Sequence, residues 1–140
     1  MVRLLPIVNA TTDLIIGASI AVHRVLGPGL LESAYVPCLT LELHRRNLDV
    51  VLGQPVPVIY QGIRIDCGYK MDMVVNDLVI VEIESVAQLA PIHEAQLLTD
   101  LKLTGYPIGL LINFNVELLK NGVRRRLNRH PAAEICFMEL

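Results

Sequence analysis

Three acidic residues lie at positions where a predicted β-hairpin would bring them together. Asp72 lies late in one predicted strand, and Glu82 and Glu84 lie on the strand after the turn at Asn76-Asp77. Side chains two residues apart on a strand point to the same face, so Glu82 and Glu84 point the same way. If Asp72 shares that face, three carboxylates converge on the hairpin.

Converging carboxylates repel one another, and the repulsion pushes one of them toward protonation. A divalent cation removes this penalty, and Mg²⁺ is often held by only one or two carboxylates together with water. Two acids, a metal ion and an activated water are what phosphodiester hydrolysis requires. Spacing alone leaves the alternative open that these acids lie on a solvated face of the hairpin.

Two helices are expected before the hairpin. The first covers Leu14–Leu26, after N-cap chemistry at Thr11-Thr12-Asp13. It is apolar nearly all round, so we expect it to be covered on more than one side. The second runs from Leu30 to about Asn47, with a kink or a late start at Pro37.

The strands are expected after Val50, where the period of the pattern changes. Prolines make Pro55–Tyr60 an expected edge strand, and Ile63–Val75 is an expected long strand with a bulge at Gly68. Leu78–Glu84 should return antiparallel to it as a central strand. The remaining expected elements are a helix over His93–Thr104, a buried strand over Tyr106–Phe114 and a short last strand at Ile135–Met138. This order predicts an α/β fold in which helices pack on a mixed sheet.

Length and composition limit the class of protein. At 140 residues the chain fits one domain, which we place over residues 1–140. Hydrophobic residues make up 53% and charged residues 19%, so the chain is not disordered. The mean hydropathy of +0.50 is high, yet every apolar run is far shorter than the roughly 20 residues of a membrane span. We therefore expect no membrane partner and assign the surplus apolar surface to a core or a subunit interface.

The compartment is inferred from the cysteines and from the N-terminus. Cys38, Cys67 and Cys136 are widely spaced and form no C-x-x-C pair, so free thiols in a reducing compartment are expected. The first residues do not resemble a signal peptide, which makes the cytoplasm the expected location.

The charge pattern does not favour a dedicated nucleic-acid binder. The net charge is −2, whereas such proteins usually carry a basic excess. Basic residues do cluster at His44-Arg45-Arg46 and at Arg124-Arg125-Arg126. A phosphate-facing edge would explain these clusters, but a solvated helix end or tail is the simpler interpretation.

Several short motifs occur together along the chain. Gly29–Tyr35 fits the pattern G-x-x-E-x-x-Y. The other motifs are Val22-His23-Arg24, Leu26-Gly27-Pro28-Gly29, Asp66-Cys67-Gly68-Tyr69, Pro91-Ile92-His93-Glu94-Ala95-Gln96 and Leu110-Leu111-Ile112-Asn113-Phe114-Asn115. With these motifs, about residues 12–127 resemble the small bacterial GxxExxY proteins, which are assigned to the PD-(D/E)XK nuclease superfamily.

The resemblance implies a restriction-endonuclease-like α-β-β-β-α-β core, with a mixed central sheet flanked by helices and a metal site at the central hairpin. Asp72 matches the superfamily aspartate, and Glu82 matches the acidic residue of its E-x-K element. The backbone carbonyl of Ile83 is an implied metal ligand, and Glu32 matches the first-helix glutamate that supports the metal. Gln96 matches the glutamine of the Q-x-x-x-Y helix. The implied cofactor is Mg²⁺ or Mn²⁺, and the implied partner is DNA or RNA.

Two positions depart from the family pattern. The lysine expected two residues after Glu82 is Glu84, which reverses the charge that would orient the attacking water. The tyrosine expected four residues after Gln96 is Asp100, which lacks the reach of a phenol and adds negative charge. We therefore expect a catalytic centre of Asp72, Glu82, Glu84 and Gln96 whose catalysis is impaired.

Other polar residues have simpler structural interpretations. His23 and His93 have no partner His or Cys at ligand spacing, so capping or core-edge roles are expected. Tyr35 and Tyr69 are expected as packing residues with a satisfied hydroxyl.

The sequence leaves two functions open. The first is a metal-dependent nuclease-like protein that hydrolyses phosphodiesters or binds nucleic acid. The second is a catalytically inactive scaffold that assembles into a homo-oligomer through its apolar helices. The apolar first helix and Val36-Pro37 on the second helix support self-association, because extensive exposed apolar surface normally becomes an interface.

Overall fold

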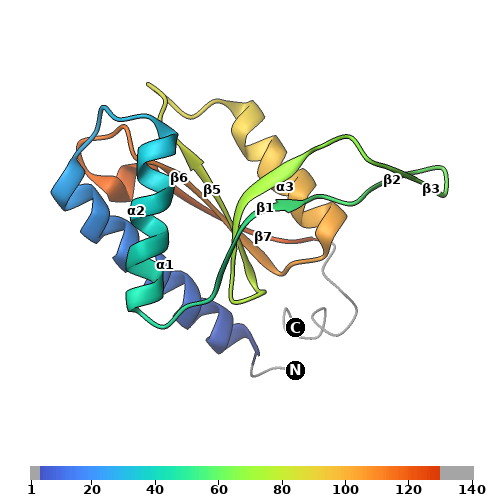
Figure 1. Cartoon of the computed structure of the whole chain (residues 1–140), viewed down its shortest axis with the longest axis horizontal. Helices are drawn as coiled ribbons and strands as arrows, with labels where there is room; N and C mark the ends of the chain where they lie inside the picture. The colour runs from blue at the N-terminus through green and yellow to red at the C-terminus, as the bar shows by residue number, and fades with distance from the viewer. Residues whose placement is uncertain (1–3, 130–140) are drawn as a thin grey trace.

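A five-stranded mixed sheet lies at the centre of the fold (Figure 1). The structure is a computed structural model that describes residues 4–129. The strands of this sheet are β1 (Val50–Pro55), β4 (Lys70–Val75), β5 (Val79–Glu84), β6 (Ile108–Asn113) and β7 (Val123–Leu127). They lie in the order β1-β4-β5-β6-β7, and neighbours are antiparallel except β5 and β6, which are parallel.

Helices cover both faces of this sheet. Helices α1 (Leu4–Leu26) and α2 (Glu32–Arg45) lie on one face, and the short 3₁₀ helix η1 (Leu119–Gly122) lies beside α1. Helix α3 (Pro91–Thr104) lies on the opposite face, where it connects the two parallel strands (Figure 1). A mixed sheet flanked by helices confirms the fold class that the sequence predicted.

The alternation of side chains along β5 determines toward which face of the sheet each side chain points. Val81 and Ile83 pack into the core under α1 and α2, whereas Ile80 packs into the second core under α3. Because side chains alternate along a strand, Glu82 and Glu84 point to the face that carries α3. The acidic residues of β5 therefore lie on the same side of the sheet as the residues of α3.

Helix α3 lies very close to β6, which fixes its position over the sheet. A Cβ atom added to Gly109 would lie 2.5 Å from Leu97 Cδ1, so the absence of a side chain permits this approach. The helix ends at Gly105, whose φ of +81° is the left-handed conformation usual for that position. The chain that leaves α3 then enters β6, whose six residues are all buried.

The predicted start of the first helix is wrong. Helix α1 begins at Leu4, and Thr11-Thr12-Asp13 lies inside it. Each threonine hydroxyl donates to a carbonyl one turn earlier, Thr11 to Ile7 and Thr12 to Asn9, which is a bond that a helix interior allows. The helix is covered on more than one side, as expected, because it contacts α2, β5 and η1, although Val25 near its end is 83% exposed.

The second helix lies within its predicted bounds and is two residues shorter at each end. It includes Pro37, which follows five residues of regular helix, so the predicted late start is wrong. Tyr35 is fully buried, and its hydroxyl donates to the Gly27 carbonyl at 2.6 Å. That bond closes the loop between α1 and α2 and confirms a packing role for Tyr35.

The first two predicted strands have the wrong bounds. The edge strand is β1, which ends at Pro55, and not Pro55–Tyr60. The predicted long strand Ile63–Val75 is divided, because Gly68 has a φ of +72° and lies in the loop before β4, not in a bulge. Two short strands, β2 (Val58–Tyr60) and β3 (Ile63–Ile65), form a separate hairpin that extends away from the sheet (Figure 1).

The basic stretch near the C-terminus is a strand and not a solvated tail. Its residues form β7, which pairs antiparallel with β6. Arg125 bonds to Asn9 of α1 and Arg126 forms an ion pair with Glu94 of α3, so the arginines attach this edge to helices of both layers. The predicted last strand at Ile135–Met138 lies outside the described residues. No helix within residues 4–129 has the length and apolar character needed to span a bilayer.

Candidate active site

The β4–β5 hairpin opens where Asp72 and Glu82 face each other. The ladder between the strands is regular as far as the pair Met73–Val81. Beyond this pair the Ile83 N–H donates to Asp72 Oδ2 at 2.8 Å, and the Asp72 N–H donates to Glu82 Oε1 at 3.2 Å. Each carboxyl group is thus bonded to the backbone of the opposite strand, and both are fixed in the opening between the strands.

The other neighbour of β4 also leaves Asp72 out of the ladder. Leu52 pairs with Met73 and Gln54 pairs with Met71, but the pair between them, Gly53 with Asp72, is not formed. Gly53 has a φ of +63°, a conformation that glycine adopts without strain. The edge strand is therefore built to bend at the position opposite Asp72, which allows the Asp72 N–H to turn toward Glu82.

Two further glutamates lie at the ends of neighbouring elements. Glu84 is the last residue of β5, with a side chain that is 17% exposed, and Glu32 is the exposed first residue of α2. Burial and the nearby Glu32 carboxyl raise the pKa of Glu84 to about 7. The Ser85 hydroxyl donates to the Leu30 carbonyl, so the residue after β5 is bonded to the loop that precedes α2.

Asp100 completes the acidic region from the side of α3. It is 1% exposed, and neither carboxyl oxygen makes a hydrogen bond of normal geometry within the described residues. Burial raises the pKa of Asp100 to about 6, although the Tyr69 hydroxyl and the Glu82 carboxyl nearby oppose this rise. A buried carboxyl without good partners is costly when ionised, so Asp100 adds to the electrostatic strain of the region.

We call these five acids the carboxylate cluster: Glu32, Asp72, Glu82, Glu84 and Asp100. Burial, with the charges of Asp72 and Asp100, raises the pKa of Glu82 to about 9. Burial also raises the pKa of Asp72, although the bond from Ile83 N–H opposes the change. In residues 4–129 no Lys or Arg forms an ion pair with the cluster. Among these residues, the His93 imidazole is the one basic group at ion-pair distance from a carboxyl of the cluster.

The structure brings together most of the residues that the sequence proposed. Glu32, Asp72, Glu82, Ile83 and Glu84 lie around the opening of the hairpin. Gln96 lies on α3 with an exposed side chain, and no hydrogen bond within residues 4–129 connects it to the cluster. No group of three His, Cys, Asp or Glu side chains in that range is arranged to hold a metal ion.

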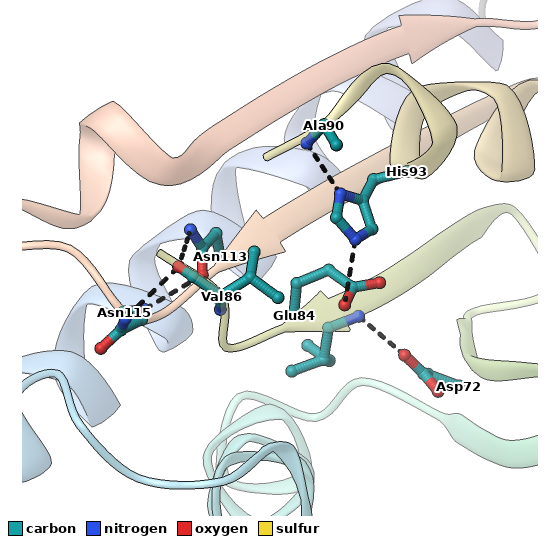
Figure 2. A network of polar contacts seen from close by, with 8 residues as sticks. Asp72, Glu84, Val86, Ala90, His93, Asn113 and Asn115 are labelled. Carbon is teal, nitrogen blue, oxygen red and sulfur yellow. Dashed lines mark hydrogen bonds and ion pairs between the residues drawn. The ribbon is translucent and has the colours of Figure 1, made fainter. Parts of the chain in front are cut away.

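Two residues near the cluster were given only structural roles from the sequence. His93 lies at the start of α3 with Nε2 3.9 Å from Glu84 Oε2 (Figure 2). The negative charges of Asp100, Glu82 and Asp72, together with burial as the largest cause, raise the pKa of Tyr69. Both residues belong to motifs visible in the sequence, but their proximity to the cluster depends on how α3 and the loop before β4 fold over β5.

A comparison with protein families identifies this architecture. The family model of the PD-(D/E)XK nuclease superfamily matches residues 9–126. The chain belongs to the PD-(D/E)XK nuclease superfamily. The match covers most of the chain and includes β4, β5 and α3. No curated protein and no solved structure matches this chain significantly.

The donor atoms at the opening suit the metals of PD-(D/E)XK nucleases, which generally use Mg²⁺ or Mn²⁺. Asp72 and Glu82 offer carboxyl oxygens, the ligand type that these hard cations prefer. The Ile83 N–H points toward Asp72, and the N–H and C=O of one strand residue point to the same side, so the Ile83 carbonyl is directed toward β4 as well. Burial is the largest cause of the raised pKa values of Asp72 and Glu82, and the charges of neighbouring carboxylates add to it. A divalent cation would favour the ionised form of both groups.

Proposed function

We propose that this protein is a metal-dependent nuclease-like protein that acts on DNA or RNA. The observation that carries the proposal is the opening between β4 and β5, where the Asp72 and Glu82 carboxyls are fixed by opposite backbone N–H groups in a member of the nuclease superfamily. The motif pattern further supports membership of the GxxExxY group within that superfamily.

In this proposal Asp72, Glu82 and the Ile83 carbonyl hold Mg²⁺ or Mn²⁺, and Glu32 supports the site from α2. When bound, the metal supplies a Lewis acid for the phosphate and lowers the pKa of a water nucleophile. The protein residues position the substrate: Gln96, which is exposed on α3, contacts nucleic acid next to the reacting phosphate.

The proposed catalysis is weaker than that of a family member with the complete motif. Glu84 stands where a lysine would stabilise developing negative charge, and Asp100 stands where a tyrosine would extend into the site. Both substitutions add negative charge to a region that already repels a phosphate.

The test is a cleavage assay on single- and double-stranded DNA and RNA with Mg²⁺ or Mn²⁺. Asp72→Ala should reduce the rate about 100-fold or more, since it removes a ligand of the catalytic metal. Glu84→Lys should raise the rate of the wild type by roughly 10-fold, because it restores a cation where negative charge develops.

Asp13→Ala is the matched control, because Asp13 is an exposed acid on α1 outside the cluster. Circular dichroism should confirm that all variants are folded. Absence of metal-dependent cleavage in both the wild type and Glu84→Lys would remove the proposal, and so would equal rates in Asp72→Ala and Asp13→Ala.

Self-association is a second candidate function, and one observation favours it. The hairpin β2–β3 extends from the body, and its apolar side chains Ile59, Tyr60 and Ile63 are 62%, 65% and 64% exposed (Figure 1). A two-stranded hairpin of this kind has little stability of its own in water. We propose that a second copy of the chain covers it, which would make the protein a homo-oligomer whether or not it is an active nuclease.

A further inference from the structure

The ring of His93 has a defined orientation because one of its nitrogens is already bonded. His93 is the third residue of α3, and its Nδ1 accepts the Ala90 N–H at 2.8 Å (Figure 2). An imidazole nitrogen that accepts a hydrogen bond carries no proton, so in the neutral ring the proton is on Nε2. The bond from the Ala90 N–H to Nδ1 therefore leaves the Nε2–H of His93 pointing away from the start of α3.

That donor faces Glu84. His93 Nε2 lies 3.9 Å from Glu84 Oε2, and the two side chains are 18% and 17% exposed. Figure 2 shows the ring extending from α3 toward the end of β5. Among the described residues, His93 is the one basic side chain at ion-pair distance from the carboxylate cluster. A distance of this size is common for catalytic contacts without substrate, which shorten when the substrate binds.

The backbone on both sides of this pair is firmly held. The Phe114 N–H donates to the Glu84 carbonyl at 3.0 Å, which continues the pairing of β5 with β6. Asn113 accepts the Val86 N–H at 3.1 Å and donates to the Val86 carbonyl at 3.0 Å, so the chain that leaves β5 is fixed as well (Figure 2). Glu84 is thus held through the bonds of its own backbone and of Val86, and the His93 ring is held by its bond to the Ala90 N–H.

We propose that His93 is a positioning residue for Glu84, and that the pair partly replaces the missing lysine of this nuclease site. His93 donates its Nε2 proton in a hydrogen bond to one oxygen of the Glu84 carboxylate and leaves the other oxygen to accept a hydrogen bond from the attacking water. This inference rests on the proposed nuclease function and assigns the orientation of the water within it.

In hydrolysis of a phosphodiester, the water O–H bond breaks and its proton passes to solvent, while the water oxygen forms a bond to phosphorus. The bond from phosphorus to the leaving sugar oxygen breaks, and that oxygen takes a proton from a second water. Glu84 and His93 orient the attacking water, and neither gains or loses a proton in the step.

Two substitutions of His93 each remove one of its two contacts, either the acceptor for the Ala90 N–H or the donor that faces Glu84. In His93→Asn, Oδ1 takes the place of Nδ1 and can accept the Ala90 N–H, but nothing reaches Glu84. In His93→Gln, the longer amide can donate to Glu84, but the acceptor for Ala90 is lost. If His93 only caps α3, His93→Gln should be the variant that loses activity. If His93 positions Glu84, His93→Asn should be the variant that loses activity.

We expect His93→Asn to keep its Tm and to lose roughly 10- to 100-fold in kcat with KM unchanged, as for other residues that orient a catalytic group. His93→Gln should have a lower Tm and stay within about 5-fold of the wild-type kcat, since one neutral donor replaces another. In a Glu84→Lys background, His93→Asn should have no further effect, because the group it orients is gone. His44→Asn, at the exposed end of α2, is the matched control.

The ¹⁵N spectrum of the imidazole rings gives a measurement that does not need activity. His93 should be protonated at Nε2, and Glu84→Gln should shift that nitrogen while His44→Asn should not. A ring protonated at Nδ1, equal losses of kcat in His93→Asn and His93→Gln, or the same loss in the Glu84→Lys background would each overturn the inference. Loss of all cleavage in the wild type, with the expected ¹⁵N result, would reject the nuclease function and retain the contact.

Discussion

At the scale of single residues, the carboxylate cluster is destabilising unless something positive reaches it. Glu82 shows this best, because it is partly buried and bonded to the Asp72 N–H while its pKa is raised to about 9. A raised pKa in the folded state means that the folded protein holds the proton more tightly than the unfolded chain. Protonation of Glu82 therefore contributes to the free energy of unfolding. This contribution is fully present below the ordinary pKa of 4.5 and is lost as the pH rises toward 9.

This linkage predicts that Glu82→Gln stabilises the protein without metal. The amide keeps an oxygen that accepts the Asp72 N–H and carries no charge. We expect its Tm to exceed the wild-type Tm in a chelating buffer, by the equivalent of about 1–2 kcal/mol at pH 8, and by less at pH 5. Thermal unfolding at the two pH values measures the difference.

Glu117→Gln is the control for removal of one negative charge, because Glu117 is exposed outside the cluster. A Glu82→Gln variant that unfolds at or below the wild-type temperature at pH 8 would show that the Glu82 carboxylate is well compensated in the folded protein. The assignment of electrostatic strain to the cluster would then be wrong.

At the scale of elements, the sequence predicted the parts that combine strong periodicity with clear turns. The buried strand β6, the central strand β5 and the helix α3 lie close to their expected positions, because continuous apolar runs and a terminal Gly105 mark them. The location of Asp72 beside Glu82 was predictable for the same reason, since Asn76 and Asp77 both have positive φ and make the tight turn that aligns the two strands.

The elements that were mispredicted depend on tertiary contacts that no local pattern contains. Three consecutive arginines do not resemble a strand, yet Arg125 and Arg126 anchor β7 to the two helix layers. Thr11-Thr12-Asp13 is a good helix start by local rules, but the apolar residues before it extend α1. The opening at Asp72 also could not be predicted, because it depends on two tertiary features. On the β1 side Asp72 does not pair with Gly53, and on the β5 side its N–H donates to the Glu82 carboxyl and not to a backbone carbonyl.

At the scale of the whole molecule, one group of exposed apolar side chains lies on the β2–β3 hairpin and the edge strand β1. The hairpin β2–β3 carries exposed isoleucines and Tyr60, and the neighbouring edge strand β1 exposes Val51 and Leu52 by about half. The sequence had assigned self-association to the helices, where Val25 and Ile7 are indeed exposed. An edge strand continuous with an apolar hairpin is a more effective surface for pairing with another chain.

Self-association can be measured directly by light scattering after size exclusion at micromolar concentration. We expect the wild type to be a dimer or larger. The double variant Ile59→Ser with Ile63→Ser should be shifted to monomer, because it removes the apolar contact surface of the hairpin. Leu118→Ser is the control, since Leu118 is also exposed but lies beside η1. A wild type that elutes as a clean monomer would contradict self-association.

In the proposed function, Asp72 and Glu82 form a divalent metal site in the opening between β4 and β5. Calorimetric titration with Mn²⁺ at pH 8 tests for this site without a substrate. We expect saturable binding by the wild type, a loss of affinity of roughly 10-fold or more in Asp72→Ala, and no change in Asp13→Ala. A wild type without saturable heat, or an Asp72→Ala variant that binds Mn²⁺ as tightly as the wild type, would contradict it.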